Sequence, residues 1–206
     1  YGDSYSLKQA VTAAFAEAWE RLWVFRLNKN PEIAGLDRTV TSTNGFAAGS
    51  SPTDAMRRSR LELLERAVML EAWQSQRGWK NYVPQSWGVR LGGLAARASG
   101  WKIQYYSLSS NAGQVLTYFL SHPRFGMAFD ATGVDAGDYK SAEAALSKSA
   151  QRWMATNART PDPYPLTELP LQAGPEAHNS LYRDPANRTA IDFLDENGLG
   201  DASVCL

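Results

Sequence analysis

Two stretches, FAEAWERLW at Phe15–Trp23 and RLELLERAV at Arg60–Val68, share one arrangement of charged residues. In each stretch a glutamate is followed three residues later by a second glutamate, and then directly by an arginine. Both lie in segments long enough to be helices, where residues three apart face the same way. The sequence therefore predicts two helices that each present a pair of carboxylates beside a guanidinium: Glu17, Glu20 and Arg21 on the first, Glu62, Glu65 and Arg66 on the second.

The apolar residues of both helices recur at intervals of three and four, which predicts one buried stripe on each. The stripes are Val11, Phe15, Ala18, Leu22 and Phe25 on the first helix, and Met56, Leu63, Ala67 and Leu70 on the second. We expect the glutamates on the opposite faces, and two interpretations of those faces stay open. They are solvated surfaces, as paired helical glutamates commonly are, or they are covered and neutralised by a hard divalent cation, because unpaired buried charges are costly.

The connection between the two helices predicts a strand followed by a loop of small residues. Arg38–Thr43 is rich in β-branched residues, which favour strands, and NGFAAGSS follows at residues 44–51. Ser51 as N-cap, Pro52 at the first helical position and Asp54 at the third predict the start of the second helix. Backbone N–H groups in such a loop can bind a phosphate. The loop lacks the Gly-Lys-Ser/Thr of a Walker motif, so an ordinary strand-to-helix connection is the alternative.

The rest of the chain predicts an antiparallel sheet and further helices. Short connections between three β-rich segments favour antiparallel neighbours. The predicted elements are a first helix to about Leu27, a second to about Gln76, an irregular Trp79–Gly93, a helical turn or short helix at Leu94–Ser99, strands at Trp101–Ser109, Gln114–Ser121 and Phe125–Thr132, a helix at Asp138–Asn157, an extended proline-rich segment at Pro161–Pro175, and one or two helices within His178–Tyr182 and Thr189–Glu196. We expect an α+β fold in a single domain, residues 1–206, with a mainly antiparallel sheet packed against long helices.

Charge and composition exclude several classes of function. The 206 residues contain 21 basic and 21 acidic side chains, so a net charge of zero gives no basis for binding nucleic acid or an anionic membrane. Cys205 is the single cysteine, which argues against an internal disulfide or a thiolate metal site. The two histidines, His122 and His178, lack the spacing of a zinc site. No apolar run of about 20 residues and no signal-peptide pattern is present, so we expect a cytoplasmic protein.

With these motifs in order, the chain resembles the YcaO family. The resemblance is carried by AVTAAFAEAWER at Ala10–Arg21, by TNGFAAGSSPTDAMRRSRLELLERAVMLEAW at Thr43–Trp73, and by His178 and Tyr182 followed by Asp184 and Pro185. It implies a YcaO-like fold and an enzyme that uses ATP and Mg2+ to phosphorylate a peptide backbone amide, for azoline or thioamide formation on ribosomally made peptides. A precursor peptide is the implied substrate, with a partner protein and a homodimer as further expectations.

The resemblance also implies roles for individual residues. It assigns Mg2+ to Glu17, Glu20, Glu62, Glu65 and Asp54, and the nucleotide to Arg66, Ser50 and Arg21. Hard carboxylate oxygens and phosphates are the ligands that Mg2+ prefers, and a metal with an arginine is a usual means of stabilising phosphoryl transfer. His178 is a candidate for proton transfer, although a lone histidine more often makes a structural hydrogen bond.

Two other functions remain as alternatives to this enzyme. The first is a non-catalytic family member that binds peptide as a scaffold and works with a partner protein. It is favoured by Lys148, Ser149 and Ala150, which stand where the family tends to carry an acid. The second is an ATP-binding enzyme that acts on a small molecule, which we rank last.

Overall fold

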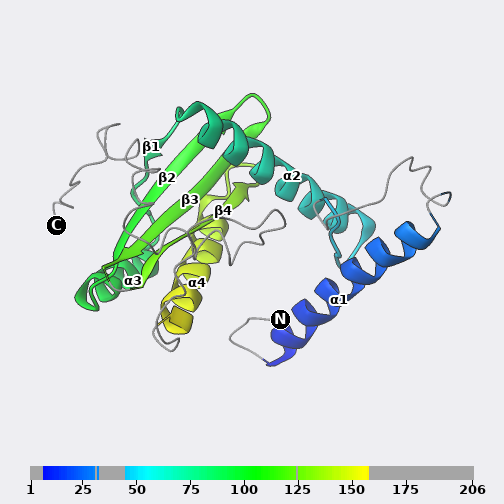
Figure 1. Ribbon diagram of the computed structural model, residues 1–206, viewed down its shortest axis with the longest axis horizontal. Coiled ribbons are helices and arrows are strands. Elements are labelled where there is room, and N and C mark those ends of the chain that lie inside the picture. The colour runs from blue at the N-terminus through cyan, green and yellow to red at the C-terminus, as the bar shows by residue number, and fades with distance from the viewer. Residues whose placement is uncertain (1–6, 31, 33–44, 124, 158–206) are drawn as a thin grey trace, which may run out of the picture. The chain divides into compact units, whose positions relative to one another are not determined.

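The computed structural model describes residues 7–30, 32, 45–123 and 125–157, and this part of the chain is α+β, as expected (Figure 1). The chain divides into two compact units, Tyr1–Leu63 and Leu64–Leu206. The boundary falls within helix α2 (Pro52–Ser75). The predicted strand at 38–43, the proline-rich segment and the helices after residue 177 lie outside the described residues.

Four antiparallel strands form the sheet of the second unit, in the order β1-β2-β3-β4. They are β1 (Lys80–Asn81), β2 (Lys102–Ser110), β3 (Gly113–His122) and β4 (Gly126–Val134). The three long strands and their antiparallel pairing confirm the prediction. Of the strands in the described residues, β1 was missed, because two residues are too short to show an alternating pattern.

Strand β3 is the centre of this unit. Six consecutive residues, Val115–Leu120, are buried. Because side chains alternate along a strand, Val115 and Phe119 join the apolar cluster on one face, while Leu116, Tyr118 and Leu120 join the cluster on the other. Helices therefore cover both faces of the sheet.

The second half of α2 covers one face. Val68 and Ala72 are buried there, and Leu64 and Trp73 pack beside them. The ring of Trp73 stacks on Phe129 with a centroid distance of 5.8 Å. Leu64 comes so close to the β2–β3 turn that only a glycine fits there, since a Cβ on Gly113 would lie 2.8 Å from Leu64 Cδ2.

The stripe predicted for α2 was therefore wrong. Met56, Leu63, Ala67 and Leu70 are exposed, whereas Glu62 and Glu65 are half-buried. Glu65 adjoins the series 64, 68, 72, which has a four-residue spacing as regular as that of the predicted stripe, whereas Glu62 contacts the loop at Gly45. The periodicity of the sequence is compatible with burial of either face of α2. The face with Leu64, Val68 and Ala72 is buried because it packs against aromatic side chains of the sheet.

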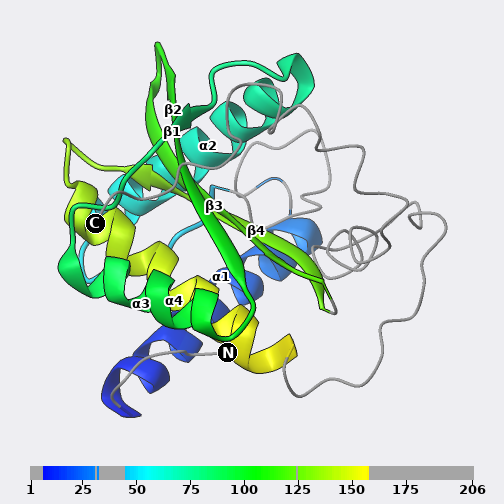
Figure 2. The ribbon, with the colours of Figure 1, turned by 90° about the vertical axis from the view of Figure 1, so that its left-hand side faces the viewer.

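Helices α3 (Trp87–Ala98) and α4 (Tyr139–Asn157) lie on the other face of the sheet (Figure 2). Helix α4 confirms the prediction for residues 138–157. For α3 the prediction was wrong in part, because residues 87–93 were expected to be irregular and are helical. The glycines of that segment, Gly88, Gly92 and Gly93, lower helix propensity, but Val89 and Ala96 are buried and fix the helix by packing.

A buried carboxylate of α4 caps the start of α3. Ser86 at the N-cap makes no side-chain capping bond. Instead, Glu143 accepts hydrogen bonds from Ser86 N (2.8 Å), Gln85 N (2.7 Å) and the hydroxyl of Tyr82 (2.6 Å). Burial raises the pKa of the Glu143 carboxyl, but these hydrogen bonds together hold that pKa below its ordinary value. The ionised carboxylate thus supplies the acceptors that the first turn of α3 needs.

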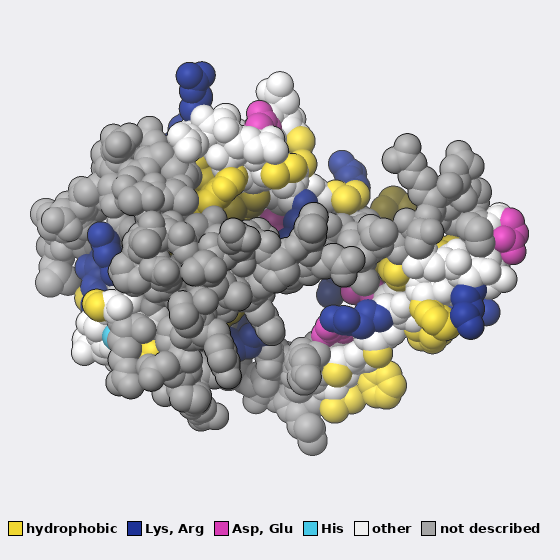
Figure 3. Space-filling view, in the orientation of Figure 1, with side chains coloured by type: hydrophobic (Ala, Val, Ile, Leu, Met, Phe, Trp, Pro, Cys, Tyr) yellow, Lys and Arg dark blue, Asp and Glu magenta, His cyan; other side chains and the backbone are white. Residues whose placement is uncertain are grey.

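The first unit contains α1 (Leu7–Lys29), the loop at residues 45–51 and the first half of α2. The stripe predicted to be buried on α1 is instead exposed. Phe15 is 73% exposed, and Val11, Leu22 and Phe25 exceed two fifths. Hydrophobic side chains accordingly gather at the surface over α1 (Figure 3). No helix in the described ranges combines the length and apolar character needed to cross a membrane.

Candidate functional site

Side chains from α1 and α2 hold the loop at residues 45–51 by its backbone. At Gly45, Glu62 Oε2 accepts a hydrogen bond from the backbone N–H at 3.3 Å, and the hydroxyl of Ser59 donates to the carbonyl oxygen at 2.5 Å. Ser59 and Glu62 are three residues apart on α2 and therefore lie on one face of the helix. Together they hydrogen-bond to both the backbone N–H and the backbone C=O of Gly45. Gly45 has a φ of +81°, a conformation that glycine adopts without steric cost.

Helix α1 holds the same loop from another point. Glu20 Oε1 accepts a hydrogen bond from the backbone N–H of Ala48 at 2.7 Å. The second glutamate of the first motif and the first glutamate of the second motif therefore bind the loop three residues apart. The structure thus brings Glu20 and Glu62 to one short segment, which their separation of 42 residues in the sequence did not reveal.

The start of α2 is fixed by a reciprocal cap. Ser51 Oγ accepts from Asp54 N at 3.2 Å, and Asp54 Oδ2 accepts from Ser50 N at 3.1 Å and from the Ser50 hydroxyl at 3.4 Å. Asp54 also pairs with Arg57 and Arg58. The Ser50 N–H and then the two guanidinium groups lower the pKa of Asp54 to about 2. The predicted helix start at Ser51 is confirmed, and Asp54 is ionised at all ordinary pH values.

Gly49 is needed because the loop passes directly over the first turn of α2. A Cβ on Gly49 would lie 2.4 Å from the backbone nitrogen of Ala55 and 2.9 Å from its Cα. Both are backbone atoms that cannot turn aside. The second glycine of the loop is therefore required by close packing of two backbone segments.

The other residues predicted for the site have separate surroundings. Glu17 pairs with Arg21 of its own helix at 2.7 Å. In the second unit, Glu65 is half-buried and Arg66 is exposed. Among the described residues, no three Asp, Glu, His or Cys side chains form a group that could hold a metal ion. His178 lies outside the described residues, and the metal and nucleotide roles of the predicted residues remain predictions.

Glu20 and Glu62 nevertheless have the chemistry that a hard cation requires. Each uses one carboxylate oxygen to hold the loop, and the other oxygen accepts no hydrogen bond from the described part of the chain. Both are carboxylates, the ligands that Mg2+ prefers. As metal ligands, these two carboxylates suit a hard cation, which would need further ligands from other groups.

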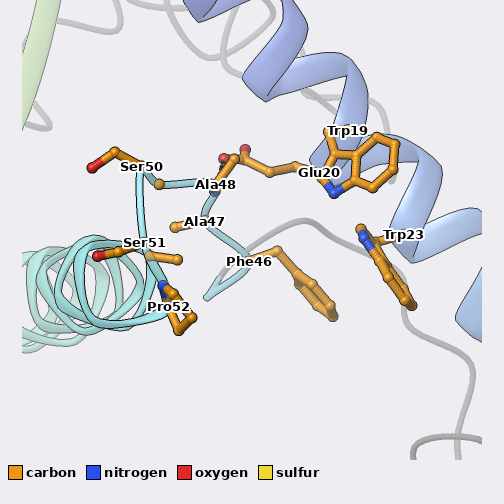
Figure 4. Close-up of a pocket in the computed structure, with 11 residues that line it drawn as sticks. Trp19, Glu20, Trp23, Phe46, Ala47, Ala48, Ser50, Ser51 and Pro52 are labelled. Atoms are coloured by element: carbon orange, nitrogen blue, oxygen red, sulfur yellow. Dashed lines mark hydrogen bonds between the residues drawn. The ribbon is translucent and has the colours of Figure 1, made fainter.

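A cavity of about 380 Å3 opens beside this loop, within the first unit. Figure 4 shows Phe46 extending from the loop toward Trp23 of α1, with Glu20 reaching to Ala48. The remaining lining residues are Trp19, Ala47, Gly49, Ser50, Ser51, Pro52 and Ala55. The volume is typical of small-ligand sites, and the walls are mainly apolar with a few polar groups at one end.

The aromatic residues of this cavity were not predicted as site residues. Trp19 and Trp23 lie four positions apart on α1, and Glu20 follows Trp19 directly. This spacing places both indoles on one side of the helix with the carboxylate beside them. The signal was therefore present in the sequence, but tryptophans are so often buried in cores that their spacing alone did not distinguish a pocket.

Comparison with known proteins identifies the family. A family model described as "YcaO cyclodehydratase, ATP- and Mg2+-binding" matches residues 31–204. This range covers most of the chain, and the protein therefore belongs to the YcaO family. The match begins after α1, so the first glutamate motif lies outside it. None of the curated proteins matches the chain.

A solved structure supports the same fold. The structure of YcaO from Methanopyrus kandleri bound with AMPPCP and Mg2+ is similar to this chain with a TM-score of 0.50 and 18% sequence identity. The similarity covers 72% of this chain and 39% of that one. The chain thus spans about two fifths of the length of this relative.

Proposed function

We propose that this chain activates a peptide backbone amide by transferring the γ-phosphoryl group of ATP to the amide oxygen, with Mg2+ as cofactor. The product would be an azoline or a thioamide in a ribosomally made peptide natural product. The observation that carries the proposal is the loop at residues 45–51, which is held by Glu20 and Glu62, one from each glutamate motif, in a chain of the YcaO family.

The chain's own residues would act mainly by positioning. Glu20 and Glu62 fix the loop and would offer their second oxygens to Mg2+, with Glu17, Glu65 and Asp54 as further proposed ligands. Arg66, which is exposed, would contact a phosphate, with Arg21 and Ser50 beside the nucleotide. Bound Mg2+ and ATP supply the phosphoryl group and the positive charge that offsets negative charge in the transition state.

The reaction balances without an additional oxidant or reductant. The amide oxygen forms a bond to the γ-phosphorus, and ADP leaves. A thiol, hydroxyl or sulfide then adds to the amide carbon, and the phosphorylated oxygen departs from that carbon as phosphate. Two protons pass to phosphate or solvent, one from the thiol or hydroxyl and one from the amide nitrogen for an azoline, or both from hydrogen sulfide for a thioamide. Phosphoryl transfer of this kind depends on positioning and charge more than on protein acid and base groups, so a proton-transfer role for His178 is not required by the proposal.

Calorimetric titration with AMPPCP, with and without Mg2+, tests the proposal on the 206-residue chain. We expect binding that requires Mg2+ and that is lost in Glu62→Gln, because the amide retains a hydrogen-bond acceptor for Gly45 but lacks the charge. Glu71→Gln, an exposed glutamate farther along the same helix, is the matched control and should bind as the parent does. Equal binding by Glu62→Gln and the parent would contradict the metal role.

A specific observation favours the second candidate, a non-catalytic scaffold that binds peptide and acts with a partner protein. Helix α4 has one acid, Glu143, and its carboxylate is buried in the cap of α3. Ser149, in the segment where the family tends to carry an acid, donates a hydrogen bond to Asp130 at 2.5 Å. Peptide binding by the chain without Mg2+-dependent binding of AMPPCP would favour the scaffold, whereas ATP hydrolysis by the chain alone would exclude it.

A further inference from the structure

The cavity beside the loop has walls suited to a flat apolar group. Trp19 is 55% exposed and Trp23 37% exposed, although indoles normally gain from burial. Phe46 extends toward Trp23 from the loop (Figure 4). Aromatic rings that line an open cavity of about 380 Å3 offer apolar area and ring faces to an incoming group.

The ring of Trp23 has a cationic neighbour within α1. The guanidinium of Arg26, three residues later on α1, lies 5.5 Å from its ring centroid. This distance is within the range of a cation–π contact. A wall that is already oriented loses little conformational freedom when a ligand binds.

Polar groups lie at one end of this cavity. The lining side chains that carry oxygen are Glu20, which accepts a hydrogen bond from the loop, and Ser50 and Ser51, which belong to the loop. A nucleotide base stacked on these rings would still need hydrogen-bond partners for its ring nitrogens and amino group. An aromatic hydrocarbon ring has no such groups to satisfy.

From these observations we propose that the cavity binds an aromatic side chain of the substrate peptide, next to the amide that is activated. The inference rests on the proposed function for the identity of the ligand as a substrate. Glu20 belongs both to the cavity lining and to the proposed cation ligands. A group in the cavity would therefore sit beside the phosphoryl-transfer site, where the substrate must be. The chain would thus favour peptides with an aromatic residue adjacent to the modified position.

Saturation-transfer NMR on the 206-residue chain without nucleotide tests this inference directly. The probes are capped tripeptides with glycine at both ends and phenylalanine, leucine, alanine or lysine in the middle. We expect the phenylalanine peptide to bind about tenfold more tightly than the alanine peptide, as expected for burial of one aromatic side chain. Tighter binding of the lysine peptide would overturn the inference in favour of a cation site, and equal binding of all four would exclude selectivity for rings.

Variants then locate the binding. Phe46→Ala should remove the preference for phenylalanine, and Phe46→Leu should reduce it while retaining the apolar volume. The matched control is Phe15→Ala, which removes an exposed phenylalanine of α1 outside the cavity and should leave binding unchanged. Circular dichroism confirms that each variant is folded. An unchanged preference in folded Phe46→Ala would overturn the inference.

Competition with AMPPCP and Mg2+ separates this inference from the proposed function. If the nucleotide displaces the phenylalanine peptide, the cavity takes the base and the inference fails while the proposed function stands. If both bind together, both are supported. If AMPPCP fails to bind but the phenylalanine peptide binds through Phe46, the proposed function fails and the cavity's selectivity for rings stands.

Discussion

In the second unit six consecutive residues of β3 are buried, whereas in the first unit the large apolar side chains of α1 lie exposed. The sheet is held by two apolar clusters, one on each face. The loop of the first unit is held by carboxylates and hydroxyls on its backbone, from Glu20, Ser59, Glu62 and Asp54. The difference teaches that the second unit is organised around buried apolar side chains, with one buried carboxylate, while the loop of the candidate site in the first unit is fixed by polar contacts.

The largest effect should come from removing the buried carboxylate of the second unit. Glu143→Ala would leave three hydrogen-bond donors without their acceptor, on Tyr82, Gln85 and Ser86. We expect a loss of about 3–5 kcal/mol in the free energy of unfolding, measured by urea denaturation. The exposed Glu71→Ala is the control, and a similar loss in both variants would contradict the capping role.

Substitution of one leucine in each unit compares the contribution of apolar side chains to stability. Leu146 is 1% exposed beneath the sheet and Leu22 is 45% exposed on α1. Leu146→Ala should cost about 3 kcal/mol because it leaves a cavity, whereas Leu22→Ala should change stability by less than about 0.5 kcal/mol. Thermal unfolding followed by circular dichroism measures both. A cost for Leu22→Ala as large as that for Leu146→Ala would show that α1 is buried in solution.

A substitution in the loop should affect the first unit alone. Gly49→Ala places a Cβ 2.4 Å from the backbone nitrogen of Ala55. We expect a local cost of about 1–3 kcal/mol from the overpacking. In hydrogen exchange, amides at residues 45–55 should lose protection while those of β3 keep it. Gly88→Ala is the control, because a Cβ there meets nothing within 4 Å. Unchanged protection of the loop would contradict the close packing.

The smallest effect concerns pH. The lowered pKa of Asp54 means that its contribution to stability is complete above about pH 4, its ordinary value being 3.8, and is lost as the pH falls through about 2. NMR titration of the carboxyl should therefore give a midpoint near 2. Ser50 donates its main hydrogen bond to Asp54 through its backbone N–H, so Ser50→Ala should change this midpoint little. A midpoint close to 3.8 would mean that the cap is absent in solution.

The fold was largely predictable, and the orientation of its helices was not. The strands, α4 and the start of α2 follow from β-rich segments, short connections and the Ser51–Asp54 cap, all of which are local signals. Burial on α2 was assigned to the wrong face because the predicted stripe through Leu63 and the buried series through Leu64 are about equally regular in the sequence. The choice between them depends on Trp73 meeting Phe129, a contact across 56 residues of sequence.

Local sequence signals also pointed to some residues of the candidate site. Paired glutamates and the glycine-bearing loop drew attention to Glu20, Glu62 and Asp54, which bond to the loop backbone and whose metal roles remain predictions, because charge spacing on a helix is a local property. That Glu20 and Glu62 bind the loop through Ala48 and Gly45 could not be read from spacing. The aromatic cavity was not predicted because Trp19, Trp23 and Phe46 are residue types that more often pack in a core, and the sequence does not distinguish the two cases.

By itself, the sequence determined most of the elements, the cap at the start of α2 and the spacing of the two acidic pairs, since these depend on residues a few positions apart. Only the tertiary structure decided which helix faces are buried, where each carboxylate points and that Trp19, Trp23 and Phe46 surround a cavity. The physical reason is that burial belongs to the surface a side chain meets, and that surface comes from residues distant in the chain.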